Sequence, residues 1–148
     1  MAALGWDEVA ERFGAAPNWW VATSGPGGPH SVPVWGVVVD GVLHFYGEPS
    51  AVRSRNLAAD PRLVLHLESG SEVLIVHGSV AIGPAAGQVR AVSAAYRAKY
   101  VDPTDLEFLP DAPGMEHALL FTVAPERAIG WVLGGPDSLE NRRWSAAR

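Results

Sequence analysis

The sequence contains no cysteine among its 148 residues. This absence excludes a disulfide framework, a thiolate metal site and a cysteine nucleophile together. The longest apolar runs have the length of strands, and residues 1–13 lack the cationic start and long apolar core of a secretory signal. We therefore expect no membrane segment, and a cytoplasmic protein.

Positive charge is also scarce. The formal net charge is −5, so the chain lacks the broad positive field that nucleic-acid binding requires, and we expect no nucleic-acid partner. Basic residues gather only locally, in 53–62 and 90–99, which leaves room for a small anionic ligand. With 48% hydrophobic and 18% charged residues, the composition is that of one compact domain spanning 1–148.

Motifs of metal and nucleophilic catalysis are missing as well. His66 and His77 fall on neighbouring predicted strands, but no short histidine–carboxylate spacing such as H-E-x-x-H is present, so we expect no metal. No G-x-S-x-G elbow supports a serine nucleophile. His30 opens a strand and either shapes a turn or faces a ligand, and a haem would need a histidine as axial ligand.

The hydrophobic pattern predicts six or seven antiparallel strands with flanking helices, which is typical of a small closed β-barrel. Spacings of three and four predict helices, and alternating or continuous apolar runs predict strands. We expect a bulge or bend at Gly78. The predicted helices are 5–14, 51–59 and 84–99; the predicted strands are 19–24, 32–39, 42–47, 62–68, 72–82, 117–123 and 127–133.

A hairpin followed by a basic helix, within 30–60, organises the chain. Asp40-Gly41 joins two β-rich runs, and both central residues of the turn that suits strand twist need a positive φ. The first run is interrupted by Pro33 and Gly36, which place it at an edge and let another group approach its backbone. A fused aromatic ring can lie against 32–36; the alternative is a barrel edge with Trp35 in a core or dimer contact.

The helix after the hairpin can bind an anion. Ser50 is a suitable N-cap, and the first helical turn offers free N–H groups at the positive end of the dipole. Arg53 is within reach of an anion there, while Arg55 and Asn56 can add bidentate and amide contacts. The alternative is an ordinary solvated helix face.

These stretches resemble the flavin-binding split-barrel family of pyridoxamine 5'-phosphate oxidase, which includes oxidoreductases that use coenzyme F420. The resemblance rests on WVATSGPGGPHSVPVWG (20–36), RSRNLAADPRLVLHLE (53–68) and, more loosely, RRW (142–144). It implies a split β-barrel of the FMN-binding type. The family contacts the ring of the cofactor through the strand that holds Pro33, Val34, Trp35 and Gly36.

The resemblance also implies contacts to the cofactor phosphate at Arg53 and Asn56. Many relatives have an Arg-Lys pair where this chain has Val52 and Arg53, so a weaker phosphate clamp is expected. Relatives often end in a basic-Trp tail that reaches the neighbouring subunit. Arg143 and Trp144 are therefore candidate cofactor residues of a homodimer, and their alternative is surface charge and a packing anchor.

We expect a homodimeric oxidoreductase that binds FMN or coenzyme F420 and transfers hydride to or from a small, apolar and conjugated organic substrate. The catalytic residue is not identified, because the cofactor performs this chemistry. Two alternatives stay open. One is a flavin or haem carrier without catalysis, whose cleft is plugged by side chains such as Trp35 or by the C-terminal tail. The other is an interaction module in which the barrel is only a dimer scaffold.

Overall fold

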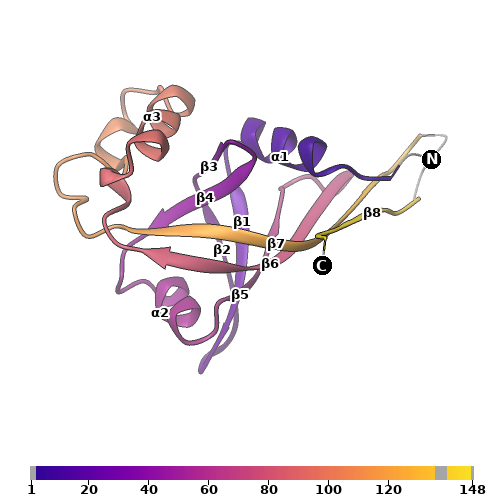
Figure 1. The fold of residues 1–148 in the computed structure, drawn as a ribbon, viewed down its shortest axis with the longest axis horizontal. Helices are drawn as coiled ribbons and strands as arrows, with labels where there is room; N and C mark the ends of the chain where they lie inside the picture. The colour runs from indigo at the N-terminus through magenta and orange to yellow at the C-terminus, as the bar shows by residue number, and fades with distance from the viewer. Residues whose placement is uncertain (1–2, 136–139, 148) are drawn as a thin grey trace.

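The computed structural model describes residues 3–135 and 140–147, which form a curled antiparallel sheet with helices packed outside it (Figure 1). Seven strands follow one another in the order β2-β1-β5-β6-β7-β4-β3, and β8 pairs with β7. The predicted mainly β architecture is confirmed. The described residues contain three α-helices.

The strands are β1 (Trp19–Gly25), β2 (Gly28–Val34), β3 (Gly36–Val39), β4 (Val42–Gly47), β5 (Arg62–His66), β6 (Glu72–Gly83), β7 (Leu119–Val132) and β8 (Arg142–Ser145). The helices are α1 (Trp6–Ala15), α2 (Val52–Ala59) and α3 (Arg90–Lys99), with two short 3-10 helices, η1 (Ala86–Gln88) and η2 (Leu106–Phe108).

A single residue separates the two end strands of this sheet. β2 lies at one end of the strand order and β3 at the other, yet only Trp35 stands between them in the chain. The predicted strand 32–39 is thus one run of chain bent at Trp35, and it supplies both edges of the barrel.

The turn and the bulge that the sequence predicts are both present. Asp40 and Gly41 have φ values of 49° and 76°, as the predicted hairpin turn requires. The β6–β7 register shifts between His77 and Gly78, which confirms the predicted bulge. A Cβ at Gly78 would lie 2.4 Å from the carbonyl oxygen of Ala124, so the close approach of β7 explains the glycine.

Two hydrophobic clusters hold the fold together. The larger one fills the barrel and is closed by α1, and its largest members include Phe13, Trp19, Phe45 and Phe121. Trp19 is fully buried, and its indole Nε1 donates to the carbonyl oxygen of Phe13 at 2.8 Å. The smaller cluster lies where α3 packs on β3, and includes Tyr96 and Tyr100.

Parts of the predicted secondary structure are wrong. The strands predicted at 117–123 and 127–133 are one strand, β7, because Pro125 lies opposite the β6 bulge, where the ladder is already irregular. The main helix begins at Arg90, not at 84, since Ala85 has a φ of 51° that interrupts helical geometry. β8 was not predicted, because its four residues carry no strand pattern.

We predict that Gly36→Ala destabilises the fold. A Cβ at Gly36 would lie 2.3 Å from the ring of Trp19, which is fully buried and unable to move aside. Such overpacking costs about 1–3 kcal/mol in the free energy of unfolding, measured by denaturant titration. Gly27→Ala is the matched control, because a Cβ at Gly27 meets nothing within 4 Å. Equal stability of the two variants would contradict this packing.

Candidate functional site

The helix after the hairpin begins later than the sequence predicts. Its first residue is Val52 and its N-cap is Ala51, with no side-chain hydrogen bond at the cap. The expected capping role of Ser50 is therefore wrong: Ser50 precedes the N-cap and is exposed. The N–H groups of a first helical turn have no partners within the helix, and they form the positive end of its dipole.

Arg53 extends from this first turn onto the end of β4. Its Nη2 donates to the carbonyl oxygen of Tyr46 at 3.4 Å, and a Cβ at Gly47 would lie 2.9 Å from the same atom. Its Nε is buried and has no hydrogen-bond partner. Burial lowers the pKa of Arg53, but a guanidinium stays charged at neutral pH. A half-buried cation with an unused donor is suited to an anionic ligand.

Buried polar side chains surround the contact of α2 with the sheet. Asn56 is 6% exposed, and its Nδ2 donates to Thr23 Oγ1 at 3.1 Å, so Asn56 anchors α2 to β1. Ser54 is 1% exposed, and its Oγ has no partner. His30, opposite Thr23 in β2, has a buried Nδ1 that also lacks a partner. Within residues 3–135 and 140–147, the unpartnered buried side-chain atoms thus come only from α2 and β2.

The predicted ring-binding strand is held by α3. Pro33 is exposed, whereas Val34 and Gly36 are buried. The Trp35 ring stacks on Tyr100 with centroids 4.7 Å apart and planes 14° apart. The Tyr96 hydroxyl donates to the carbonyl oxygen of Trp35 at 2.7 Å.

Lys99 joins three elements around Gly36. Its Nζ donates to the carbonyl oxygen of Gly36 at 2.6 Å and to that of Phe13, at the end of α1, at 3.5 Å. The ammonium also lies 5.5 Å from the ring centroid of Trp19 and 5.3 Å from that of Tyr100, which are cation–π distances. Burial lowers the pKa of Lys99 from 10.5 to about 8.

Tyr46 connects the two halves of the site. Its carbonyl oxygen accepts from Arg53, and its ring packs edge-on against Tyr96, with centroids 5.0 Å apart. Its hydroxyl donates to the carbonyl oxygen of Phe108 in η2. Burial raises the pKa of Tyr46 to about 12, so the hydroxyl stays protonated at neutral pH. The side chains from Arg53 to Trp35 therefore form one connected set.

Four residues of the site, Tyr46, Tyr96, Lys99 and Tyr100, were not predicted from the sequence. Tyr96 lies within the predicted helix 84–99 and Tyr100 follows it directly, and neither hydroxyl gave a signal. Each of these residues acts through partners 61 to 64 positions away in the chain: Phe108 is 62 from Tyr46, and Trp35 and Gly36 are 61 to 64 from the α3 residues. No local pattern in a single sequence identifies such pairs.

The C-terminal candidates lie far from these residues. Figure 1 shows β8 at the end of the molecule opposite α2 and α3. The ring centroids of Trp144 and Trp6 are 4.7 Å apart, and Arg142 forms a 2.8 Å ion pair with Glu8. Arg143 is exposed. Any contact of Arg143 or Trp144 with a cofactor on α2 would therefore involve a second copy of the chain.

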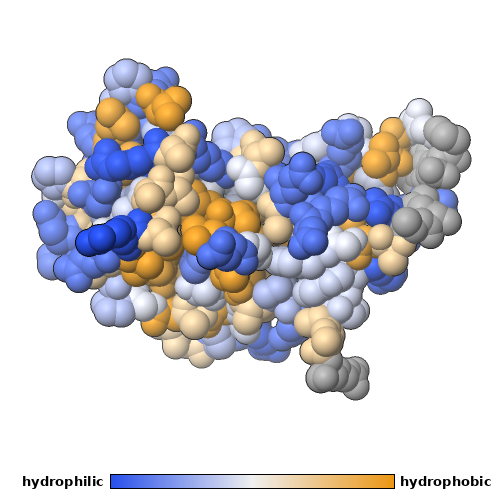
Figure 2. Space-filling model, turned by 45° about the horizontal axis from the view of Figure 1, so that its top comes forward, coloured by the Kyte–Doolittle hydropathy of each residue, from blue (hydrophilic) through white to orange (hydrophobic). Residues whose placement is uncertain are grey.

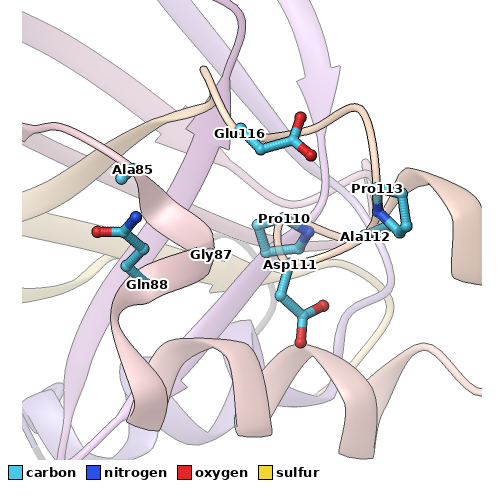
Figure 3. Close-up of a pocket in the computed structure, with 8 residues that line it drawn as sticks. All are labelled: Ala85, Gly87, Gln88, Pro110, Asp111, Ala112, Pro113 and Glu116. Carbon is cyan, nitrogen blue, oxygen red and sulfur yellow. The ribbon is translucent and has the colours of Figure 1, made fainter.

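A separate surface pocket of about 290 Å³ lies between η1 and 110–116 (Figure 3). Both of its carboxylates are already engaged: Asp111 accepts two hydrogen bonds from Arg97 in α3, and Glu116 accepts from the N–H of Gly114. We assign this pocket no role in the site.

Residues 3–135 and 140–147 contain neither a metal-binding cluster nor a membrane-spanning helix. There, no three His, Asp or Glu side chains gather as a metal ion would require. No helix of those ranges has the length and apolar character needed to cross a bilayer.

Comparisons with known proteins found a matching family model and solved structures with a similar fold. The family model described as pyridoxamine 5'-phosphate oxidase matches residues 6–132. A conserved hypothetical protein from Mycobacterium tuberculosis has a TM-score of 0.67 and 21% identity, over 91% of this chain and 95% of its own. An F420 reductase has a TM-score of 0.57 and 22% identity, over 80% of this chain and 94% of its own.

A heme binding protein from Mycobacterium smegmatis also superposes, with a TM-score of 0.69 and 17% identity, over 98% of this chain and 60% of its own. At such identities these structures bear on the fold alone, and they confirm the predicted split β-barrel. No curated protein matches the sequence.

We predict that Lys99 makes the free energy of unfolding depend on pH in the alkaline range. Its pKa is about 8 in the folded chain and 10.5 ordinarily, so between these values the unfolded chain binds more protons. The free energy of unfolding must then rise with pH across this window, and the burial cost of the ammonium applies fully below pH 8.

The measurement is the difference in unfolding free energy between the unmodified chain and Lys99→Met, at pH 7 and pH 10. Tyr46, Tyr96 and Tyr100, whose pKa values burial raises, are common to both proteins, so their ionisation largely cancels. The difference should increase toward pH 10. A constant or decreasing difference would show that the Lys99 ammonium is not destabilised by burial.

Proposed function

This chain belongs to the pyridoxamine 5'-phosphate oxidase family, and we propose that it is an oxidoreductase that binds FMN or coenzyme F420. It transfers hydride to or from a small organic substrate. The observation that carries this proposal is Arg53, a half-buried cation whose Nε has no partner and which has no carboxylate partner among the described residues. Both cofactors contain a phosphate beside a fused ring.

The residues present fit the phosphate of such a cofactor. Arg53 supplies charge and an unused donor, and the first-turn N–H groups of α2 supply further donors. Ser50 and Arg55 are exposed beside this turn and are free to approach a phosphate. Asn56 keeps its predicted phosphate contact only through the second N–H of its Nδ2, since the first donates to Thr23.

The ring of the cofactor would lie along the strand that ends at Trp35. α3 side chains engage backbone groups of Trp35 and Gly36 but none of Pro33 and Val34. Pro33 and Val34 pair with β1 on one edge of β2, and β2 is the last strand of the order, so its other edge has no strand partner among the described residues. We therefore expect Pro33 and Val34 to provide most backbone contacts to the ring, with Trp35 and Gly36 shaping the wall beside it.

The bound cofactor supplies the hydride chemistry, and the chain supplies binding, orientation and exclusion of water. Leu106 and Phe108 in η2 are 40% and 52% exposed, and the carbonyl oxygen of Phe108 is bonded to Tyr46. Figure 2 shows hydrophobic residues exposed on the lobe that α3 and the segment after it form. This apolar surface beside the site supports an apolar, conjugated substrate.

The proposal includes a homodimer formed through the outer face of the sheet, which we define as Trp20, Val64, Ile75 and Ile129. Trp20, His66, Ile75 and Ile129 are register partners across β1, β5, β6 and β7, so they form one row. The apolar residues of this face belong to neither core cluster. A second copy would bury them.

The same face contains Arg143. It pairs with Ile129 in the β7–β8 ladder, so it extends the row of Trp20 and Ile75 by one strand. Trp144 is its neighbour on the opposite face and packs against Trp6. Arg143 is therefore the residue of the tail that we expect to reach the cofactor of a second copy.

A carrier without catalysis is the second candidate function. One observation favours it: Trp35 is half-buried and stacks on Tyr100 beside the expected position of the ring. A side chain that plugs the cleft of a carrier would lie there. Reduction of the bound cofactor followed by its reoxidation with a panel of conjugated acceptors discriminates the two. Turnover supports the oxidoreductase, and binding without turnover supports the carrier.

We predict that Arg53→Ala weakens cofactor binding with retained folding. Loss of a charged hydrogen bond to phosphate costs about 1.5–3 kcal/mol of binding free energy. Cofactor-free protein is titrated with FMN and with coenzyme F420, followed by calorimetry at fixed salt. Arg90→Ala, an exposed arginine on α3, is the control for a change in net charge. Unchanged affinity for both cofactors in Arg53→Ala would remove the phosphate role of Arg53.

We predict that Ile75→Asp converts a dimer to a monomer. Ile75 lies in the middle of the row on the outer face, and an interface cannot bury an unpaired carboxylate without a large cost. Sedimentation velocity measures the mass of each variant. Val101→Asp, at a site 70% exposed and outside this face, should leave the assembly unchanged. A monomeric unmodified chain, or an Ile75→Asp dimer, would show that this face is not the interface.

A further inference from the structure

The bend at Trp35 leaves backbone groups pointing off the sheet edge. The N–H and C=O of a strand residue point to the same side, and both groups of Gly36 bond to α3 side chains instead of to a strand. α3 therefore covers the edge of β3 at the residue where the ring-binding strand begins again. Uncovered, these groups would be an open strand edge.

The hydroxyl of Tyr100 has one proton and serves two partners. It accepts from the N–H of Gly36 at 3.1 Å and donates to the carbonyl oxygen of Pro17 at 2.7 Å. The carbonyl oxygen of Gly36 is a poorer acceptor for it at 3.3 Å, and Lys99 occupies that oxygen at 2.6 Å. Tyr100 and Lys99 together thus satisfy both backbone groups of Gly36.

Tyr100 also fixes the Trp35 side chain, because its ring stacks on the Trp35 ring. The Lys99 ammonium in turn lies 5.3 Å from the centroid of the Tyr100 ring. Behind Gly36 the ring of Trp19 leaves no room for a shift in that direction. Backbone and side chain at the bend are therefore held from both sides.

We propose that Tyr100 and Lys99 are positioning residues: they hold the Trp35–Gly36 bend so that Pro33 and Val34 present a preformed surface to the ring of the cofactor. The inference rests on the proposed function. The phosphate side has two contacts that involve neither Tyr100 nor Lys99: Asn56 donates to Thr23, and Arg53 donates to the carbonyl oxygen of Tyr46. Loosening the bend should therefore weaken binding of the ring and leave the phosphate contacts intact.

The test uses ligand pairs that differ in the phosphate. FMN is compared with riboflavin, and coenzyme F420 with its phosphate-free deazaflavin nucleoside, each titrated into the full chain. Tyr100→Phe keeps the stacked ring and removes only the hydroxyl, and Lys99→Met keeps the aliphatic stem. Each should lower affinity by about two- to tenfold, equally for both members of a pair. Arg53→Ala should lower affinity only for the phosphorylated member.

Three further measurements separate positioning from general destabilisation. At saturation, the absorption spectrum of the bound ring should differ between Tyr100→Phe and the unmodified chain, whereas Arg53→Ala should keep the unmodified spectrum. Lys99→Arg, which retains a cationic donor, should recover part of the affinity lost in Lys99→Met. Arg97→Met, on the same helix but paired with Asp111, should change neither affinity nor spectrum.

The outcomes are distinguishable. If the unmodified chain binds no member of either pair, the proposed function fails and this inference fails with it. If it binds a pair, and Tyr100→Phe and Lys99→Met bind both members as tightly and with the same spectrum, only the inference is overturned. If these variants lose affinity for the phosphorylated member alone, Tyr100 and Lys99 support binding of the phosphate, and their assignment to the ring is wrong.

Discussion

The contact between the Trp19 ring and the backbone of Gly36 is the constraint on which the rest of the structure depends. A Cβ at Gly36 would lie 2.3 Å from the Trp19 ring, which is too close for any side chain. Trp19 itself is bonded to the end of α1, because its indole N–H donates to the carbonyl oxygen of Phe13. The bend that joins the two edge strands is thereby placed against the barrel core. α3 can then pack on the other side of the bend, and the site lies between α3 and α2.

Local chemistry predicted much of this fold. Asp40-Gly41 specified its turn because few residues tolerate positive φ at both central positions. Gly78 marked the bulge because β7 passes too close for a side chain. Pro125 led to the wrong prediction of two strands in place of β7. A strand tolerates its missing N–H because Pro125 lies opposite the bulge, and that position depends on the register of β6 and β7.

The candidate site also contains residues that the sequence predicts and residues that it does not. Arg53 was predicted because the charge and its position at a helix start are both visible in the sequence, and the partnerless Nε supports that assignment. Ser50 failed as a cap because the helix starts one residue later than its pattern. Tyr46 and Tyr100 were missed because their hydroxyls bond to carbonyl oxygens on distant segments, and only the folded chain defines those pairs.

The pairing of β4 with β7 has a consequence for how the barrel is made. His44 and Thr122, which face each other across this pair, are 78 residues apart in the chain. Such non-local pairing requires closure of a long loop, and the entropy cost of closure comes before most stabilising contacts form. Folding should therefore be slow compared with that of a helical protein of equal size. Until β7 is in place, the hairpin of β3 and β4 has no neighbour on its inner edge. Early packing of α1 on this hairpin covers one of its faces but leaves that edge open until β7 pairs with it.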